Sequence, residues 1–96
     1  MYYVLFYTAA ENYLEKRAPY REAHLNLARA AHARGELVIA GALADPPDSA
    51  ILVFKGNDPS VAENFAKHDP YVANGAVIRW NVRPWTVVIG GDNNAP

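Results

Sequence analysis

His24 is the side chain in this sequence that is best placed to move a proton. Imidazole exchanges protons near neutral pH more readily than any other side chain. His24 follows Tyr20 by four residues and Arg21 by three, so all three side chains face one side of an expected helix. His32 and His68 fall near the ends of expected helices, and we interpret both as surface residues.

A histidine that acts as a base needs a second group to fix its tautomer, and this group is commonly a carboxylate. Asp69 is the candidate, because it stands between His68 and Pro70, where a helix must stop. The structural alternative is a hydrogen-bonded His24 at a contact between two helices. In that case Asp69 and Pro70 would simply open a type I turn, and Arg21 would be a solvated helix charge.

Composition excludes several other chemistries. The 96 residues contain no cysteine, which rules out disulfides, thiolate metal sites and cysteine nucleophiles and leads us to expect a cytoplasmic protein. Nine Lys and Arg against ten Asp and Glu give a net charge of −1, so no basic surplus exists to bind nucleic acid or an anionic membrane. No apolar stretch approaches the length of a membrane helix.

The length of the chain and its polar end bound its organisation. We expect residues 1–96 to form one domain, with a core over about residues 1–85 and a C-terminal extension over 86–96. The tail from residue 90 is glycine-rich and polar, and we expect it to be flexible. No set of His, Asp and Glu shows metal-ligand spacing, so we expect neither a metal nor another cofactor.

The pattern of apolar residues predicts strands and helices in alternation. Residues 2–8 are rich in aromatic and β-branched side chains, as in a buried strand. Residues 19–34 lack glycine and begin with a proline, which predicts a helix preceded by a loop or short turn. Strands are expected at 36–43, where Gly41 indicates a bulge or a close approach to the backbone, and at 50–55.

The second half of the chain continues this pattern. The Asp-Pro pair at 58–59 opens a helix, which must end before Asp69 because a proline follows. Residues 76–83 alternate between polar and apolar side chains, which predicts another strand. We expect the chain to turn at 84–85, and residues 86–89 could then add a short edge strand.

The resulting order, β-α-β-β-α-β, is the ferredoxin-like α+β arrangement, in which both helices cover one face of the sheet. The opposite face must find other cover, most simply a second subunit that packs sheet to sheet. Because both helices lie on the same face, the Asp69 carboxylate can approach the helix that carries His24.

Several motifs in the chain resemble the YciI-like (YCII-related) family. An R-x-x-H-L motif starts at Arg21 and a D-P-Y motif starts at Asp69. The resemblance runs from the first strand to about Trp85. One departure is Gly41-Ala42, where the family has Gly-Pro, so the wall of the cleft near the second strand differs. The other matching segments are 35–37, 40–42, Gly75 and 82–85.

The resemblance implies a dimeric α+β barrel made of ferredoxin-like protomers. It also implies an active-site cleft around a His–Asp pair, which falls on His24 and Asp69 in this sequence. Members of the family with an assigned reaction act on lactones of aromatic-degradation pathways as dehalogenating lyases, and most members have none. The resemblance therefore indicates a class of chemistry and leaves the substrate open.

We therefore expect a lyase or isomerase that needs no cofactor, with His24 and Asp69 as the catalytic pair and a small carboxylated or lactone-type substrate. The alternative is a non-catalytic, small-molecule-binding or stress-related module on the same homodimeric scaffold. No feature favours a third reading, a cofactor-free oxygenase. The expected substrate-binding residues are Arg21 as a carboxylate anchor, Tyr71 and Gly41, with Trp85 as a further pocket-lining residue.

Overall fold

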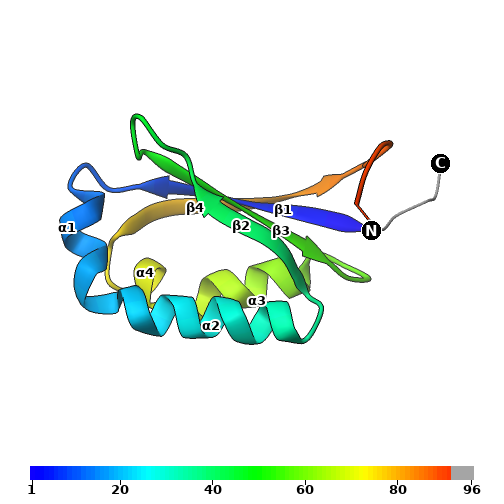
Figure 1. The fold of residues 1–96 in the computed structure, drawn as a ribbon, viewed down its shortest axis with the longest axis horizontal. Coiled ribbons are helices and arrows are strands. Elements are labelled where there is room, and N and C mark those ends of the chain that lie inside the picture. Colours follow the sequence, from blue (N-terminus) through cyan, green and yellow to red (C-terminus); the bar gives the residue numbers. More distant parts are fainter. Residues whose placement is uncertain (92–96) are drawn as a thin grey trace.

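The computed structural model describes residues 1–91, which form one antiparallel sheet covered by helices on one face (Figure 1). The strands are arranged in the order β2-β3-β1-β4. Along the chain the elements are β1 (Tyr2–Ala9), α1 (Tyr13–Arg17), the 3-10 segment η1 (Ala18–Tyr20), α2 (Arg21–Ala33), β2 (Leu37–Ala42), β3 (Ser49–Lys55), α3 (Ser60–His68), α4 (Pro70–Ala73) and β4 (Val77–Trp85).

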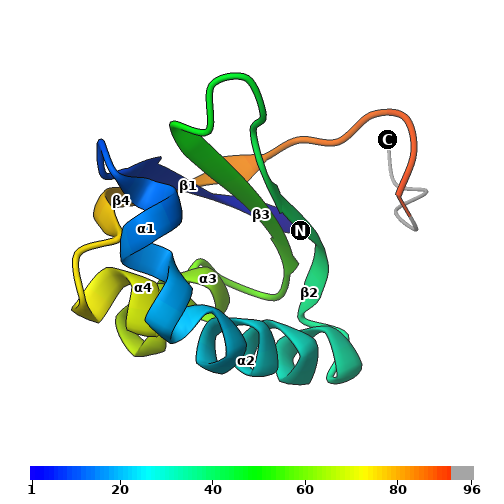
Figure 2. The ribbon, with the colours of Figure 1, turned by 60° about the vertical axis from the view of Figure 1, so that its left-hand side comes forward.

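The core lies between the sheet and the helices α2, α3 and α4, as both views show (Figures 1 and 2). β1 contributes Tyr3, Leu5 and Tyr7 to it, because alternate residues of a strand point to the same face. Ala31 of α2 is buried against this layer, and Leu27 packs beside it. The predicted α+β class is confirmed.

The first helical region differs from the prediction in its start. Residues 13–17, expected as a loop or short turn, form α1. The 3-10 segment η1, which contains Pro19, joins α1 to α2. Proline has no backbone N–H to donate, so it interrupts a helix interior but is well tolerated in the first turn of a helix. The break between α1 and α2 therefore falls at Pro19. The helix that was expected from residue 19 therefore begins at Arg21 as α2.

The C-terminal elements also differ from the prediction. β4 runs on through Pro84 and Trp85, where a turn was expected, and Pro84 lies opposite Tyr3 of β1. An edge strand tolerates proline because one side of its backbone has no ladder partner. Residues 86–89 form no strand. Of the tail expected to be flexible, residues 92–96 lie outside the described part of the chain.

β2 and β3 pair as the predicted antiparallel hairpin, but their irregularity is not at Gly41. The register shifts between Leu37 and Ile39, so the bulged residue is Val38. Gly41 pairs regularly with Ile51, and a Cβ atom added to it would meet nothing within 4 Å. The predicted bulge at Gly41 is therefore wrong, and the expected close approach to its backbone stays a prediction.

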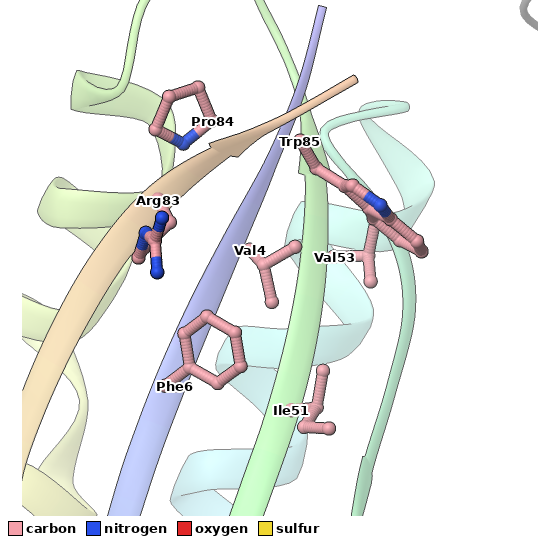
Figure 3. Close-up of a pocket in the computed structure, with 7 residues that line it drawn as sticks. All are labelled: Val4, Phe6, Ile51, Val53, Arg83, Pro84 and Trp85. Carbon is pink, nitrogen blue, oxygen red and sulfur yellow. The ribbon is translucent and has the colours of Figure 1, made fainter. Parts of the chain in front are cut away.

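Within the described residues, the second face of the sheet carries no helix. Val4 and Phe6 of β1 lie there beside Ile51 and Val53 of β3, on the side of the strands that faces away from the helices (Figure 3). Together with the end of β4 these side chains line a groove of about 390 Å³. In residues 1–91, no helix has the length and apolar character required to cross a bilayer.

Candidate active site

Asp69 is a completely buried carboxylate at the junction of α3 and α4. Its backbone is extended, because Pro70 follows and excludes the helical conformation before it. This break ends α3 and makes Asp69 the N-cap of α4, where its Oδ1 accepts a hydrogen bond from the Tyr71 backbone N–H at 3.0 Å. The local sequence thus fixes the carboxylate rigidly inside the core.

His24 of α2 meets this carboxylate. Its Nδ1 lies 2.9 Å from both Oδ1 and Oδ2 of Asp69. The Tyr7 hydroxyl of β1 donates a third hydrogen bond, to Oδ2 at 2.7 Å. An ionised carboxylate only accepts hydrogen bonds, so the His24 ring must carry its proton on Nδ1. Neutral His24 therefore keeps a lone pair on Nε2, and in residues 1–91 this nitrogen has no hydrogen-bond partner.

Aromatic contacts hold the plane of the imidazole. The His24 ring stacks on the Tyr71 ring with 3.9 Å between centroids and 6° between planes. The Phe65 ring meets it edge-on at 6.3 Å. The side chain keeps 15% of its surface exposed, whereas Asp69 keeps none. The imidazole is therefore fixed on one side and accessible on the other.

The accessible side of His24 forms part of the wall of a cavity of about 340 Å³ between the helices and β2. Tyr13 and Tyr71, whose rings meet edge to face at 6.0 Å, line the cavity at the end near α1 and α4. Gly41 of β2 lines it on the sheet side. Ligand pockets start at roughly 300 Å³, so this cavity suits a small molecule.

The pKa values of two tyrosine hydroxyls at the site are raised. Burial raises the pKa of the Tyr7 hydroxyl far above its usual range, and the negative charge of Asp69 adds to the effect. Burial also raises the pKa of Tyr71, with the neighbouring Tyr13 adding, while Arg21 and Arg17 oppose the shift. Both hydroxyls therefore remain proton donors at neutral pH.

The sequence of this chain matches the YCII-related domain over residues 1–86. The chain belongs to that family. A comparison with curated proteins gave no significant match.

Solved structures agree with this YCII-related fold. The 5-chloro-2-hydroxyhydroquinone dehydrochlorinase TftG from Burkholderia phenoliruptrix, in complex with 2,5-dihydroxybenzoquinone, is similar with a TM-score of 0.75 and 16% identity. The match covers 90% of this chain and 94% of TftG. A structural-genomics protein from Agrobacterium tumefaciens is similar with a TM-score of 0.53 and 12% identity, over 86% of this chain and 89% of that one. At these identities the likeness establishes a shared fold.

The YCII-related structure gathers most of the residues singled out from the sequence. Arg21, His24, Gly41 and Tyr71 line one cavity, and Asp69 lies behind His24. Their roles in catalysis and binding remain predictions.

Three other candidates lie elsewhere. Trp85, expected to line the pocket, lines the groove on the opposite face of the sheet, so that prediction is wrong. His32 and His68 use Nδ1 to bind the Leu37 and Asn64 carbonyl oxygens, and neither lines the cavity. Both are exposed, as expected.

Tyr7, Tyr13 and Arg17 complete the site and were not singled out from the sequence. Tyr7 sits in a nearly continuous apolar run, in which nothing separates a core tyrosine from one that binds a carboxylate. Tyr13 and Arg17 belong to α1, whose five residues are too few to show a helical period. Within residues 1–91, no cluster of three or more His, Cys, Asp and Glu side chains could hold a metal ion.

Proposed function

We propose that this YCII-related protein is an enzyme in which His24 and Asp69 move a proton on a small substrate. One observation carries the proposal: the His24 ring is held by a buried carboxylate at Nδ1, while its accessible side forms part of a cavity wall. A carboxylate at one ring nitrogen fixes the tautomer and stabilises the imidazolium that forms after proton transfer. The arrangement is that of a general base with its positioning group.

The proposed reaction starts at a carbon next to a carbonyl group. Nε2 of His24 takes the proton, and the C–H electron pair moves onto the carbonyl oxygen as an enolate. In an elimination, the C=O bond re-forms, the former C–H pair makes a C=C bond to the neighbouring carbon, and the leaving group departs with its bonding electrons. The His24 imidazolium then releases its proton to solvent. In an isomerisation of a β,γ-unsaturated substrate, the enolate is conjugated with the C=C bond. His24 returns the proton to the γ carbon, and the double bond moves next to the carbonyl. Neither course changes the oxidation state of the enzyme or needs a co-reactant.

The cavity and a similar solved structure together support one class of substrate. A volume of about 340 Å³ suits a molecule with one ring. TftG, whose fold is similar, is a dehydrochlorinase of a chlorinated hydroxyhydroquinone. For this chain we infer a small carboxylated, lactone-type or hydroxylated cyclic substrate, with halide elimination as one of its outcomes.

Deuterium exchange tests the proton transfer without knowledge of the product. Carboxylated unsaturated lactones are incubated with the protein in D2O, and deuterium entry next to the carbonyl is followed by NMR. A chlorinated hydroxyhydroquinone is assayed in parallel for chloride release. We expect exchange or release with the wild type and a loss of about 10²-fold or more in His24→Gln, the size of a general-base contribution.

His68→Gln is the matched control, because His68 is exposed and does not line the cavity. It should keep the wild-type rate. Equal rates in His24→Gln and the wild type would contradict the proposal, and so would a loss of the same size in the control.

A non-catalytic binding module is the second candidate, and the bonds of Asp69 favour it in one respect. The carboxylate caps α4 and binds Tyr7, so it also has a structural role. On this alternative the wild type binds a small acid in the cavity, yet no candidate substrate exchanges a proton in its presence. The exchange experiment therefore separates the two candidates.

A further inference from the structure

The cavity beside His24 has a strongly positive end. Arg17, at the end of α1, and Arg21, at the start of α2, both line it. The ion pairs in residues 1–91 are Arg29 with Glu22, Arg34 with Glu36 and His24 with Asp69, so neither cavity arginine is neutralised by a carboxylate. No acidic residue in the described part of the chain lines the cavity. An anion would balance this charge.

The two arginines are presented differently to the cavity. The Arg17 guanidinium lies 5.0 Å from the centre of the Tyr13 ring, a cation–π contact that restrains the half-buried side chain. Arg21 is exposed and therefore adaptable. A restrained guanidinium beside a mobile one suits an anion that enters from solvent, because the second side chain can close on it.

The Tyr71 hydroxyl is an independent indication that this end of the cavity can bind a ligand. Tyr71 is 1% exposed, and its hydroxyl oxygen is buried without a hydrogen-bond partner in residues 1–91. Arg21 comes near this oxygen and opposes the rise of its pKa, but does not meet it with hydrogen-bond geometry. Buried hydroxyl groups normally have a hydrogen-bond partner. A buried hydroxyl without one, next to two cations, therefore suits an anionic hydrogen-bond acceptor.

We propose that Arg17, Arg21 and the Tyr71 hydroxyl form a subsite that binds the carboxylate of the substrate. This inference rests on the proposed function. It adds the residues that bind the substrate carboxylate and the end of the cavity at which this carboxylate lies. The planar guanidinium fork matches a carboxylate, and the tyrosine adds a neutral donor.

The stack of His24 on Tyr71 limits the shape of the substrate. Because the ring centroids are 3.9 Å apart, a carboxylate at the Tyr71 hydroxyl stays within one side-chain length of the imidazole. The carbon that loses its proton must therefore lie only a few bonds from the carboxylate. The subsite selects compact acids, such as a carboxylated lactone, over neutral rings and over long-chain acids.

Binding of benzoate tests the subsite separately from catalysis. Benzoate and its neutral analogue benzamide are titrated into the full chain at low salt, and the amide shifts of residues around the cavity are followed by NMR. We expect benzoate to bind at least about ten-fold more tightly than benzamide, since a charge-assisted bidentate pair is roughly twice as strong as a neutral one. Arg17→Gln and Arg21→Gln should each weaken benzoate about ten-fold, and Arg21→Lys should weaken it less.

Arg29→Gln is the matched control, because Arg29 lies on α2 but does not line the cavity. Its benzoate affinity should stay within about two-fold of the wild type, as expected for an exposed ion pair. Tyr71→Phe should bind benzoate more weakly while keeping the stack on His24. Thermal unfolding of each variant shows whether it is folded.

Three results would overturn the subsite: benzamide binding as tightly as benzoate, unchanged affinity in both cavity-arginine variants, or no benzoate binding in the wild type. His24→Gln distinguishes the two proposals. If it binds benzoate normally and wild-type exchange is absent, the subsite stands and the catalytic proposal fails. If exchange depends on His24 but benzoate binding ignores both arginines, the reverse holds.

Discussion

At the scale of single residues, Tyr7 makes the stability of the fold depend on pH. Its folded-state pKa lies far above 10 because of burial and of the Asp69 charge. Above pH 10 the unfolded chain releases the Tyr7 proton and the folded chain retains it, so stability present below pH 10 falls as the pH rises. The slope is about 1.4 kcal/mol per pH unit for each such group.

Above pH 10, Tyr7→Phe should therefore reduce the fall in the free energy of unfolding by about 1.4 kcal/mol per pH unit, the contribution of one titrating group. It should also lower stability at pH 7 by about 1 kcal/mol, because a hydrogen bond is lost. Urea unfolding between pH 7 and 11 measures both effects. Tyr20→Phe is the control, since Tyr20 makes no hydrogen bond to Asp69. A Tyr7→Phe slope equal to that of the wild type would contradict this account.

Asp69→Asn tests the carboxylate itself. The amide turns one acceptor oxygen into a donor, so one of the hydrogen bonds from Tyr7, Tyr71 or His24 is either lost inside the core or must reverse its direction. We expect a loss of about 1–3 kcal/mol in the free energy of unfolding, measured with denaturant at pH 7. Asp48→Asn, at an exposed carboxylate, should change it by less than about 0.5 kcal/mol. Equal stability of both variants would contradict the role of Asp69 in the core.

At the scale of elements, we expect alanine substitutions at two glycines to affect the free energy of unfolding differently. Gly35 ends α2 with a φ of +81°, a conformation that side chains disfavour. Gly35→Ala should lower the free energy of unfolding by about 1 kcal/mol. Gly41 has no such φ, and a Cβ there meets nothing within 4 Å, so Gly41→Ala should change it by less than about 0.5 kcal/mol. Denaturant unfolding compares the two, and a greater loss at Gly41 would show that β2 is packed differently.

The elements also show how far the sequence predicts this structure. Proline and aspartate signals located the end of α3, and the order of elements brought Asp69 toward the helix of His24. The sequence did not reveal Tyr7, because alternation within a nearly all-apolar strand does not say which face meets the helices. It also did not reveal α1, whose short length carries no period, and Arg17 was missed with it.

At the scale of the whole molecule, the second face of the sheet exposes apolar side chains that a partner could cover. Phe6 and Trp85, which line the groove of Figure 3, are 38% and 47% exposed on the described chain. Ile39, which lines a neighbouring hollow with Ile51 and Val53, is 67% exposed. Contiguous apolar surface of this kind marks interaction sites. We propose that a second copy of the chain covers it, sheet against sheet.

Sedimentation at micromolar concentration tests this proposal. The wild type should run at twice the 10.6 kDa mass of the chain. Trp85→Glu should shift it toward the monomer, because a charge is costly to bury in an apolar interface. Leu14→Glu, at an exposed leucine of α1, should remain dimeric. A monomeric wild type would refute the dimer.

The most direct test of the central claim is the tautomer of His24. Long-range ¹⁵N–¹H NMR of the imidazole, assigned with His24→Gln, reports which ring nitrogen carries the proton. We expect the proton on Nδ1 and a free lone pair on Nε2 in the neutral wild type, and loss of this preference in Asp69→Asn. A proton on Nε2, or a tautomer unaffected by Asp69→Asn, would contradict the assignment of His24 as a base positioned by Asp69.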